Sequence, residues 1–258
     1  MPNLLHSQKL GDGPPLLIVH GLFGSGDNWR TIGKSFSSHY TVYLIDLRNH
    51  GQSFHSDTMS YSDMAMDIKS FCDGYGLEKV TLIGHSMGGK VGMQVSHDYP
   101  ELLEKLIVAD IAPKRYPPQH DDILAGLSAI DFDQVQSRSD ILEVLKVHIS
   151  SVMVQQFLLK SMVCDDKGCR ALINIPVIRD QYESIAAAPA FLDGFQSQTP
   201  TLFLAGEVST YILSSDHALM QQYFKSMHVV TVPKAGHWLH AEAPQFCIDV
   251  IDSFLNPG

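Results

Sequence analysis

The stretch that decides the fold is GHSMG, residues 84–88, which directly follows the apolar run VTLI at residues 80–83. A serine between two glycines at the end of a buried strand is typical of a nucleophile elbow, a sharp turn from strand to helix. A side chain at either glycine would collide with the backbone of so tight a turn. We therefore expect Ser86 to project above the edge of a sheet, where a substrate carbonyl can reach it.

Short apolar runs alternate with segments of helical periodicity on both sides of this turn. Besides residues 80–83, strands are predicted over residues 16–19, 41–45, 106–109, 201–204 and 228–232. Such near-continuous apolar strands, separated by helices, indicate an α/β fold with a mostly parallel sheet covered on both faces. A further strand at residues 4–9 is expected to form a hairpin with residues 16–19 through the turn GDGPP, residues 11–15.

The span between the strands at residues 106–109 and 201–204 is too long for a plain connection and needs its own structure. Apolar spacing predicts helices around residues 123–130 and 141–149, and DDKG at residues 165–168 is expected to turn a hairpin. The insertion follows a strand end, on the side of the sheet where catalytic loops collect. We therefore expect a core formed by residues 1–113 and 196–258, with residues 114–195 as a mainly helical cap over the site.

Composition excludes several classes of function. The chain has 258 residues, 45% of them hydrophobic, and a formal net charge of −10, which argues against non-specific binding to nucleic acid or anionic membranes. The chain starts without a basic and apolar leader, and residues 16–19 are too few to span a bilayer. The four cysteines form neither a CxxC pair nor a metal-ligand cluster, so we expect free thiols, no metal and a cytoplasmic protein.

The predicted base is His237. A serine hydroxyl is a weak nucleophile at neutral pH and needs a base to take its proton and a carboxylate to orient that base. In this fold the acid and the histidine follow the serine along the chain. His237 lies in AGHW, residues 235–238, after the last predicted strand. His240 is the alternative.

The acid departs from the usual pattern. An aspartate is commonly placed as Gly-x-x-Asp after the penultimate strand, but this chain reads GEVS at residues 206–209, with Ser209 in the acid position. Asp110 ends a neighbouring strand, and the ends of adjacent parallel strands converge on the same imidazole. Asp216 lies in SSD, residues 214–216, which resembles a helix cap. We favour Asp110 over Asp216, with Ser209 as an auxiliary hydrogen-bond partner near the histidine.

Two backbone N–H groups are predicted to bind the oxyanion of the tetrahedral intermediate. One belongs to Met87, at the start of the helix after the elbow, and the other to Leu22, in the turn after the first central strand. A second polar turn, DLRNHGQS at residues 46–53, lacks a phosphate-binding pattern. We expect this turn to be held by a network between Asp46 and Arg48.

Four motifs together resemble the α/β-hydrolase superfamily, and look most like the YbfF-type bacterial esterases. They are HGLFGS at residues 20–25, DLRNHGQS at 46–53, GHSMGGK at 84–90 and GHWLHAE at 236–242. The resemblance runs from about residue 4 to residue 255. It implies a carboxylesterase or thioesterase acting on acyl esters, acyl-CoA among them, with Ser86, Asp110 and His237 as nucleophile, acid and base. It also implies Ser209 as a fourth, assisting residue.

We therefore predict a serine hydrolase that cleaves a small acyl ester or thioester through an acyl-enzyme intermediate, without cofactor or metal. One alternative is a carbon–carbon bond hydrolase or lyase on the same scaffold, which would need polar groups projecting from the cap. The other is a non-catalytic ligand-binding protein, which would have no need for Ser86 together with an acid and His237.

Overall fold

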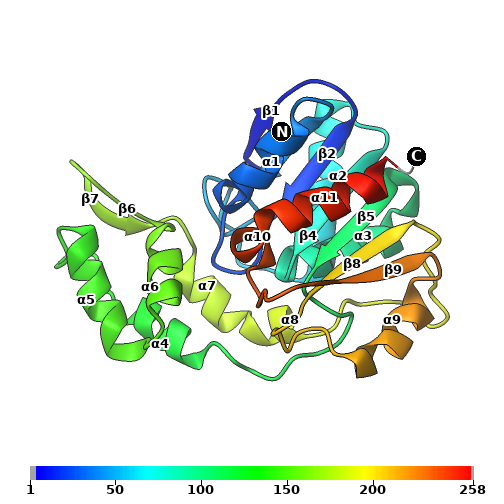
Figure 1. Cartoon of the computed structure of the whole chain (residues 1–258). Coiled ribbons are helices and arrows are strands. Elements are labelled where there is room, and N and C mark those ends of the chain that lie inside the picture. Colours follow the sequence, from blue (N-terminus) through cyan, green and yellow to red (C-terminus); the bar gives the residue numbers. More distant parts are fainter. Residues whose placement is uncertain (1–3, 257–258) are drawn as a thin grey trace.

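In the computed structural model, which describes residues 4–256, seven strands form one sheet in the order β1-β3-β2-β4-β5-β8-β9 (Figure 1). They are β1 (Ser7–Leu10), β2 (Pro15–Val19), β3 (Thr41–Ile45), β4 (Val80–His85), β5 (Leu103–Ala109), β8 (Thr201–Gly206) and β9 (Met227–Val232). Each neighbouring pair is parallel except β1 with β3, which is antiparallel. The predicted α/β fold with a mostly parallel sheet is confirmed.

The predicted hairpin at the N-terminal end of the sheet is wrong. Strand β1 pairs with β3, with Ser7 opposite Ile45. Strand β2 is a central strand whose two edges are taken by β3 and β4. The turn at residues 11–15 therefore carries the chain from the outer strand past β3 into the sheet, and β1 takes the edge of β3 that remains open.

Helices cover both faces of the sheet. On one face lie α1 (Arg30–Phe36) and α11 (Pro244–Leu255), and on the other α2 (Tyr61–Tyr75) and α3 (Met87–Asp98). Side chains of β2 point alternately to the two faces of the sheet. Leu16 and Ile18 belong to one apolar cluster, and the residue after each of them belongs to the cluster on the other face. Short elements complete this part: η1 (Gly26–Trp29), η2 (Pro100–Leu102), η3 (Ser214–Asp216), α9 (His217–Tyr223) and α10 (Leu239–Glu242).

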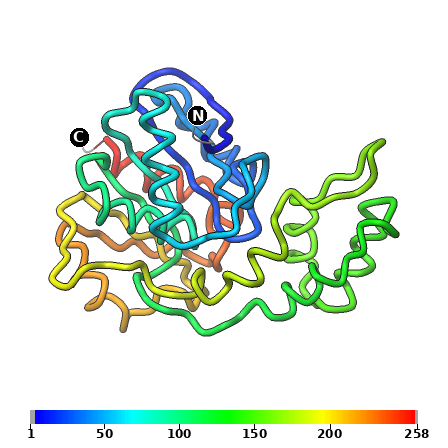
Figure 2. The backbone as a smooth tube through the Cα atoms, turned by 180° about the vertical axis from the view of Figure 1, so that it is seen from behind, coloured from blue at the N-terminus to red at the C-terminus, as the bar shows by residue number. Residues whose placement is uncertain are grey.

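The long span between β5 and β8 has its own helices and a hairpin, as predicted. Its elements are α4 (Asp121–Ser128), α5 (Arg138–His148), α6 (Val152–Leu159), β6 (Met162–Asp165), β7 (Gly168–Ala171), α7 (Ile175–Asp180) and α8 (Tyr182–Ala186). Figures 1 and 2 show α4, α5, α6 and the β6–β7 hairpin extending to one side of the sheet, with α7 and α8 leading back to it. The division into core and cap at residues 114 and 195 stays a prediction.

The expectation of four free thiols is wrong for two of them. The β6–β7 hairpin places Cys164 directly opposite Cys169, and the pair forms a disulfide. Their spacing in sequence gave no sign of this, because only the register of the hairpin brings the two side chains together. Cys72 and Cys247 are free and buried. Within residues 4–256, no helix has both the length and the apolar character needed to cross a membrane.

The turn from β4 to α3 depends on a close approach of two glycines. A Cβ added to Gly84 would lie 2.2 Å from the carbonyl oxygen of Gly88, so the collision expected from the sequence is confirmed. We expect Gly84→Ala to lower the free energy of unfolding by about 3 kcal/mol, measured by urea denaturation, because backbone rather than a movable side chain must give way.

Gly76→Ala is the matched control for this prediction. Gly76 caps α2 with a φ of 66°, and an added Cβ would meet nothing within 4 Å. We therefore expect Gly76→Ala to lower the free energy of unfolding by about 1–2 kcal/mol, because a residue with a Cβ is disfavoured in the left-handed conformation. Equal losses in the two variants would contradict a steric requirement at the elbow.

Candidate active site

Ser86 lies at the carboxyl end of β4 in a strained backbone conformation. Its φ is 50° and its ψ is −116°, a region that residues other than glycine seldom adopt and that is concentrated at functional sites. The backbone N–H of Ser86 donates to the carbonyl of Ala109 on β5 at 2.9 Å. Gly21 packs against it, because a Cβ there would lie only 3.2 Å from the Cβ of Ser86. The serine hydroxyl is therefore held at the sheet edge, between the elbow and the loop after β2.

Asp110 directly follows β5 and is fully buried, with a φ of 52°. Its Oδ1 accepts the backbone N–H of Gly206 at 3.0 Å. Its Oδ2 accepts from the Ser209 hydroxyl and from Nδ1 of His237, the latter at 2.8 Å. A buried carboxylate is tolerated when it is paired and hydrogen-bonded, and these three donors meet that need. The structure thus brings together three of the predicted site residues.

His237 lines a cavity and is anchored through one of its two ring nitrogens. Because Nδ1 donates to the Asp110 carboxylate, the hydrogen-bond pattern assigns the proton of the neutral ring to Nδ1 and leaves Nε2 as the basic atom. The ring stacks on Tyr211 with 3.7 Å between centroids. His237 and Ser86 line the same cavity. Within residues 4–256, the Ser86 Oγ makes no hydrogen bond of 3.5 Å or less to His237.

The alternative acid and base make contacts that suit other roles. The Asp216 carboxylate accepts from Nζ of Lys114 at 2.5 Å and from the backbone N–H of Leu213 at 2.9 Å, at the start of α9. His240 is buried and stacks on Trp29, with 4.3 Å between ring centroids. Burial, followed by the charge of His237, lowers the pKa of His240 to about 3. The Asp216 carboxylate therefore closes the η3 turn, and His240 is a buried neighbour of His237 in the wall of the same cavity.

The backbone N–H groups of Leu22 and Met87 are available for a ligand. Both residues line the cavity next to Ser86. In the part of the chain that the structure describes, neither N–H donates to an acceptor of the protein. The Met87 N–H also belongs to the first turn of α3, where a helix attracts negative charge. The serine therefore has two unoccupied backbone donors beside it in the cavity.

Two buried histidines support the loop that contains Leu22. His20 accepts the backbone N–H of Leu47 on Nε2 at 3.0 Å, and its Nδ1 donates to the carbonyl of Gly21 at 2.8 Å. His50 accepts the backbone N–H of Phe23 on Nε2 at 3.1 Å. Burial lowers the pKa of both, that of His50 to about 3, so each ring stays neutral and keeps an acceptor nitrogen.

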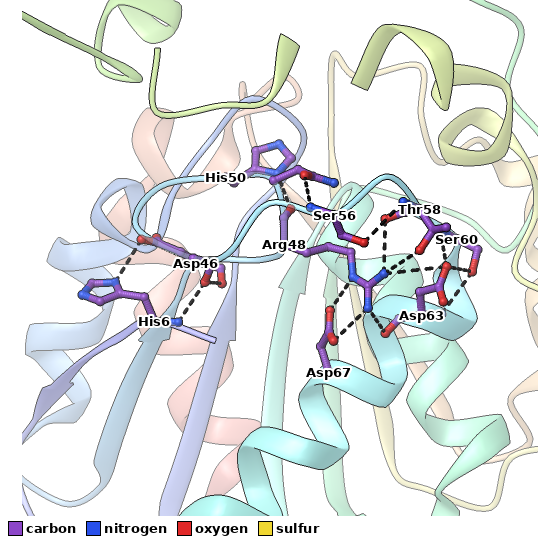
Figure 3. Close-up of polar contacts among 11 residues, drawn as sticks. His6, Asp46, Arg48, His50, Ser56, Thr58, Ser60, Asp63 and Asp67 are labelled. Atoms are coloured by element: carbon purple, nitrogen blue, oxygen red, sulfur yellow. Dashed lines mark hydrogen bonds and ion pairs between the residues drawn. The ribbon is translucent and has the colours of Figure 1, made fainter. Parts of the chain in front are cut away.

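The turn at residues 46–53 is held differently from our prediction, because Asp46 and Arg48 bind separate parts of the chain (Figure 3). The Asp46 carboxylate accepts backbone N–H groups of Gly26 at 2.7 Å and Gln52 at 2.9 Å. Arg48 is buried and its guanidinium donates to both oxygens of Asp67 on α2, at 2.5 and 2.8 Å. Asp46 therefore closes the turn while Arg48 attaches it to α2, which fixes His50 beneath the Leu22 loop.

Two cavities meet at Ser86. The first is lined by aromatic side chains of the core and of the long insertion, with Lys90 among them. The second is lined by His237 and Trp238, with further apolar side chains from α4 and α6. Leu22, Ser86 and His120 border both. Ser86 therefore lies where the two cavities adjoin.

Sequence reasoning missed the polar pair that the insertion places over the serine. The Tyr182 hydroxyl oxygen accepts the backbone N–H of Gln119 at 3.2 Å and lies 2.6 Å from Nδ1 of His120. The contact between the Tyr182 hydroxyl and Nδ1 holds the imidazole of His120 at the cavity, with the direction of the hydrogen bond set by the tautomer of the ring. Residues 120 and 182 are far apart in sequence and follow no motif, so no local signal pointed to them.

Comparison with known proteins identifies the family. Residues 14–244 match a family model described as alpha/beta hydrolase fold. The chain belongs to the alpha/beta-hydrolase family. The solved structure of a marine microorganism esterase has a TM-score of 0.94 and 42% sequence identity, covering 98% of this chain and 99% of that chain.

Two curated relatives of this alpha/beta hydrolase are named as ester-cleaving enzymes. Esterase YbfF of Escherichia coli is 34% identical over 254 residues, which cover 97% of this chain and 96% of that enzyme. The sn-1-specific diacylglycerol lipase ABHD11 of Danio rerio is 35% identical over 256 residues, 96% of this chain and 80% of that enzyme. The chain is a carboxylic ester hydrolase with a small-molecule ester as substrate, and the predicted resemblance to YbfF-type esterases is confirmed.

Proposed function

We propose that Ser86, His237 and Asp110 cleave the ester through an acyl-enzyme. The observation that carries this proposal is the 2.8 Å contact between His237 Nδ1 and the buried Asp110 carboxylate, beside a cavity that contains Ser86. In this mechanism, Nε2 of His237 takes the proton of Ser86 as Oγ attacks the ester carbonyl. Asp110 holds the ring in the required tautomer and stabilises the imidazolium that forms.

The later steps use the same groups. The oxyanion of the tetrahedral intermediate accepts hydrogen bonds from the N–H groups of Leu22 and Met87. His237 then donates its proton to the leaving alcohol, and an acyl-serine remains. A water molecule, deprotonated by His237, attacks that acyl group, and His237 then returns the proton to Oγ of Ser86 as the acid leaves. Because catalytic hydrogen bonds commonly tighten only when substrate is bound, rotation of the Ser86 side chain toward Nε2 belongs to the first step.

We propose Ser209 as a positioning residue for the acid. Its hydroxyl donates to Oδ2 of Asp110, the same oxygen that accepts from His237. Ser209 in turn accepts the backbone N–H of Tyr211 at 3.2 Å. This arrangement supports separate roles for the two residues. Asp110 supplies the negative charge, and Ser209 fixes the orientation of the Asp110 carboxylate.

We also propose that residues 114–195 act as a cap over the site. A separate proposal concerns the substrate: acyl thioesters, acyl-CoA among them, are cleaved as well as oxygen esters. Support for the cap comes from His120, Tyr182 and the α6 side chain of Phe157, which all border the cavities at Ser86. Support for thioesters is chemical, since the same attack on the carbonyl expels a thiol without a further catalytic group.

Replacing the nucleophile tests the mechanism. We expect Ser86→Ala to lower kcat for p-nitrophenyl butyrate by about 10³-fold or more, because no other group can form the acyl intermediate. A fluorophosphonate probe should label the wild-type chain but not the variant, as read by intact-protein mass spectrometry. Ser253→Ala, a surface serine on α11, serves as the control. Undiminished turnover by Ser86→Ala would refute the mechanism.

Replacing the two candidate acids separates their roles. We expect Asp110→Asn to reduce kcat by about 10³- to 10⁴-fold, because an amide no longer stabilises the imidazolium or enforces the tautomer. Asp216→Asn should keep most of its activity per folded molecule, since Asp216 pairs with Lys114 instead. Steady-state kinetics on both variants, with folding checked by circular dichroism, decides between them. A larger loss in Asp216→Asn would assign the acid to that residue.

A further inference from the structure

Lys90 provides the formal charge in the first cavity. It follows Ser86 by one turn on α3, and only 2% of its surface is exposed. Among the described residues that line this cavity, Lys90 is the only lysine, and none is an arginine, aspartate or glutamate. Side chains on a helix lean toward its N-terminus, so the stem of Lys90 runs toward the end of α3 at which Ser86 lies.

The Lys90 ammonium has partners but no counter-ion. Its Nζ donates to the carbonyl oxygens of Ala187 at 2.5 Å and Ala186 at 3.2 Å, and lies 4.9 Å from the ring centroid of Tyr116. No carboxylate of residues 4–256 lies within 4.0 Å of it. An ammonium has three N–H donors, so one remains after the two carbonyls are satisfied.

Burial of this charge is costly in the absence of an anion. Desolvation, followed by the positive charge of Arg115, lowers the pKa of Lys90 to about 7. An unbranched apolar side chain such as methionine would fill the same space without that penalty. A carboxylate brought by a ligand would supply the missing negative charge and keep the ammonium protonated.

The remaining walls of the cavity suit a hydrocarbon chain. The Tyr61 hydroxyl donates to the carbonyl of Ile185 at 2.5 Å, and the Tyr116 hydroxyl donates to the carbonyl of Tyr211 at 2.6 Å. The Tyr182 hydroxyl is engaged by His120. Because these hydroxyls are occupied, the tyrosines offer mainly their ring faces to the cavity, and Lys90 is left as its charged group.

The position of His237 indicates which part of the ester enters this cavity. His237 delivers the proton to the leaving alcohol, and it lines the second cavity but not the first. The alcohol therefore leaves through the second cavity, and the acyl chain remains in the first, next to Lys90. This step rests on the function proposed above for Ser86 and His237.

We propose that Lys90 binds the terminal carboxylate of a short acyl chain, so that the enzyme prefers monoesters of short dicarboxylic acids to neutral esters. Because Lys90 follows Ser86 by one turn of α3 and its stem leans back toward the serine, only a short acyl chain fits between the two side chains. Lys90 is thereby a specificity residue, and its ion pair with the substrate forms inside a protein whose formal net charge is −10.

Two methyl esters of matched shape test this proposal. Monomethyl succinate carries a carboxylate where methyl 4-methylpentanoate carries an isopropyl group. We expect the wild-type enzyme to show a higher kcat/KM for monomethyl succinate, measured by acid release in a pH-stat. In Lys90→Met, the ratio of the two kcat/KM values should fall about tenfold or more. A loss of this size is what removal of a hydrogen bond between charged groups produces.

The ratio separates specificity from a structural role. If Lys90 only ties α3 to the end of α8, both kcat/KM values fall alike and the ratio stays constant, which would overturn the proposal. A wild-type enzyme without preference for monomethyl succinate would also overturn it while leaving the esterase mechanism intact. Failure of the wild-type enzyme to hydrolyse either ester would instead count against the mechanism.

A measurement on the wild-type chain covers the case in which Lys90→Met does not fold. Succinate is the acid released from the preferred monoester, so it should inhibit hydrolysis of methyl 4-methylpentanoate competitively. 4-Methylpentanoate, which has its one carboxylate at the reacting end, should inhibit at least tenfold more weakly. Equal inhibition by the two acids would contradict recognition of a distal carboxylate.

Discussion

The buried carboxylate of Asp110 joins the ends of three neighbouring strands. It directly follows β5, accepts a backbone N–H at the end of β8 through Gly206, and accepts from His237 in the loop after β9. A buried charge is stable only while its hydrogen bonds are satisfied, so these segments are held in mutual register. The position of the imidazole therefore follows from the strand order β5-β8-β9.

The other half of the site depends on close backbone approach. Gly84 and Gly88 allow the turn that projects Ser86, and Gly21 lets the loop after β2 pass beside it. That loop is in turn held by His20 and by the turn at residues 46–53, which Arg48 attaches to α2. Contacts well outside the cavity thus stabilise the loop that packs against the strained backbone of Ser86.

The sequence predicted what local patterns encode. Apolar runs located the central strands, and the glycines around Ser86 located the elbow. The choice of His237 as the base rests on chain order and stays a prediction. Asp110 was predicted from the convergence of parallel strand ends, a rule of topology. The pairing of β1 was wrong, because the choice between two strand edges depends on which neighbour occupies them in three dimensions. The disulfide, His120 with Tyr182, and the surroundings of Lys90 arise only once the insertion folds against itself and against the sheet.

A crystal structure of the enzyme inhibited with a diethyl phosphonate tests the central claim most directly, because the adduct mimics the tetrahedral intermediate. We predict phosphorus bonded to Oγ of Ser86, with the phosphoryl oxygen in hydrogen-bond contact with the N–H groups of Leu22 and Met87. His237 should retain its contact with Asp110 and turn Nε2 toward the adduct. Phosphorus on another residue, or a phosphoryl oxygen directed away from both N–H groups, would contradict the account.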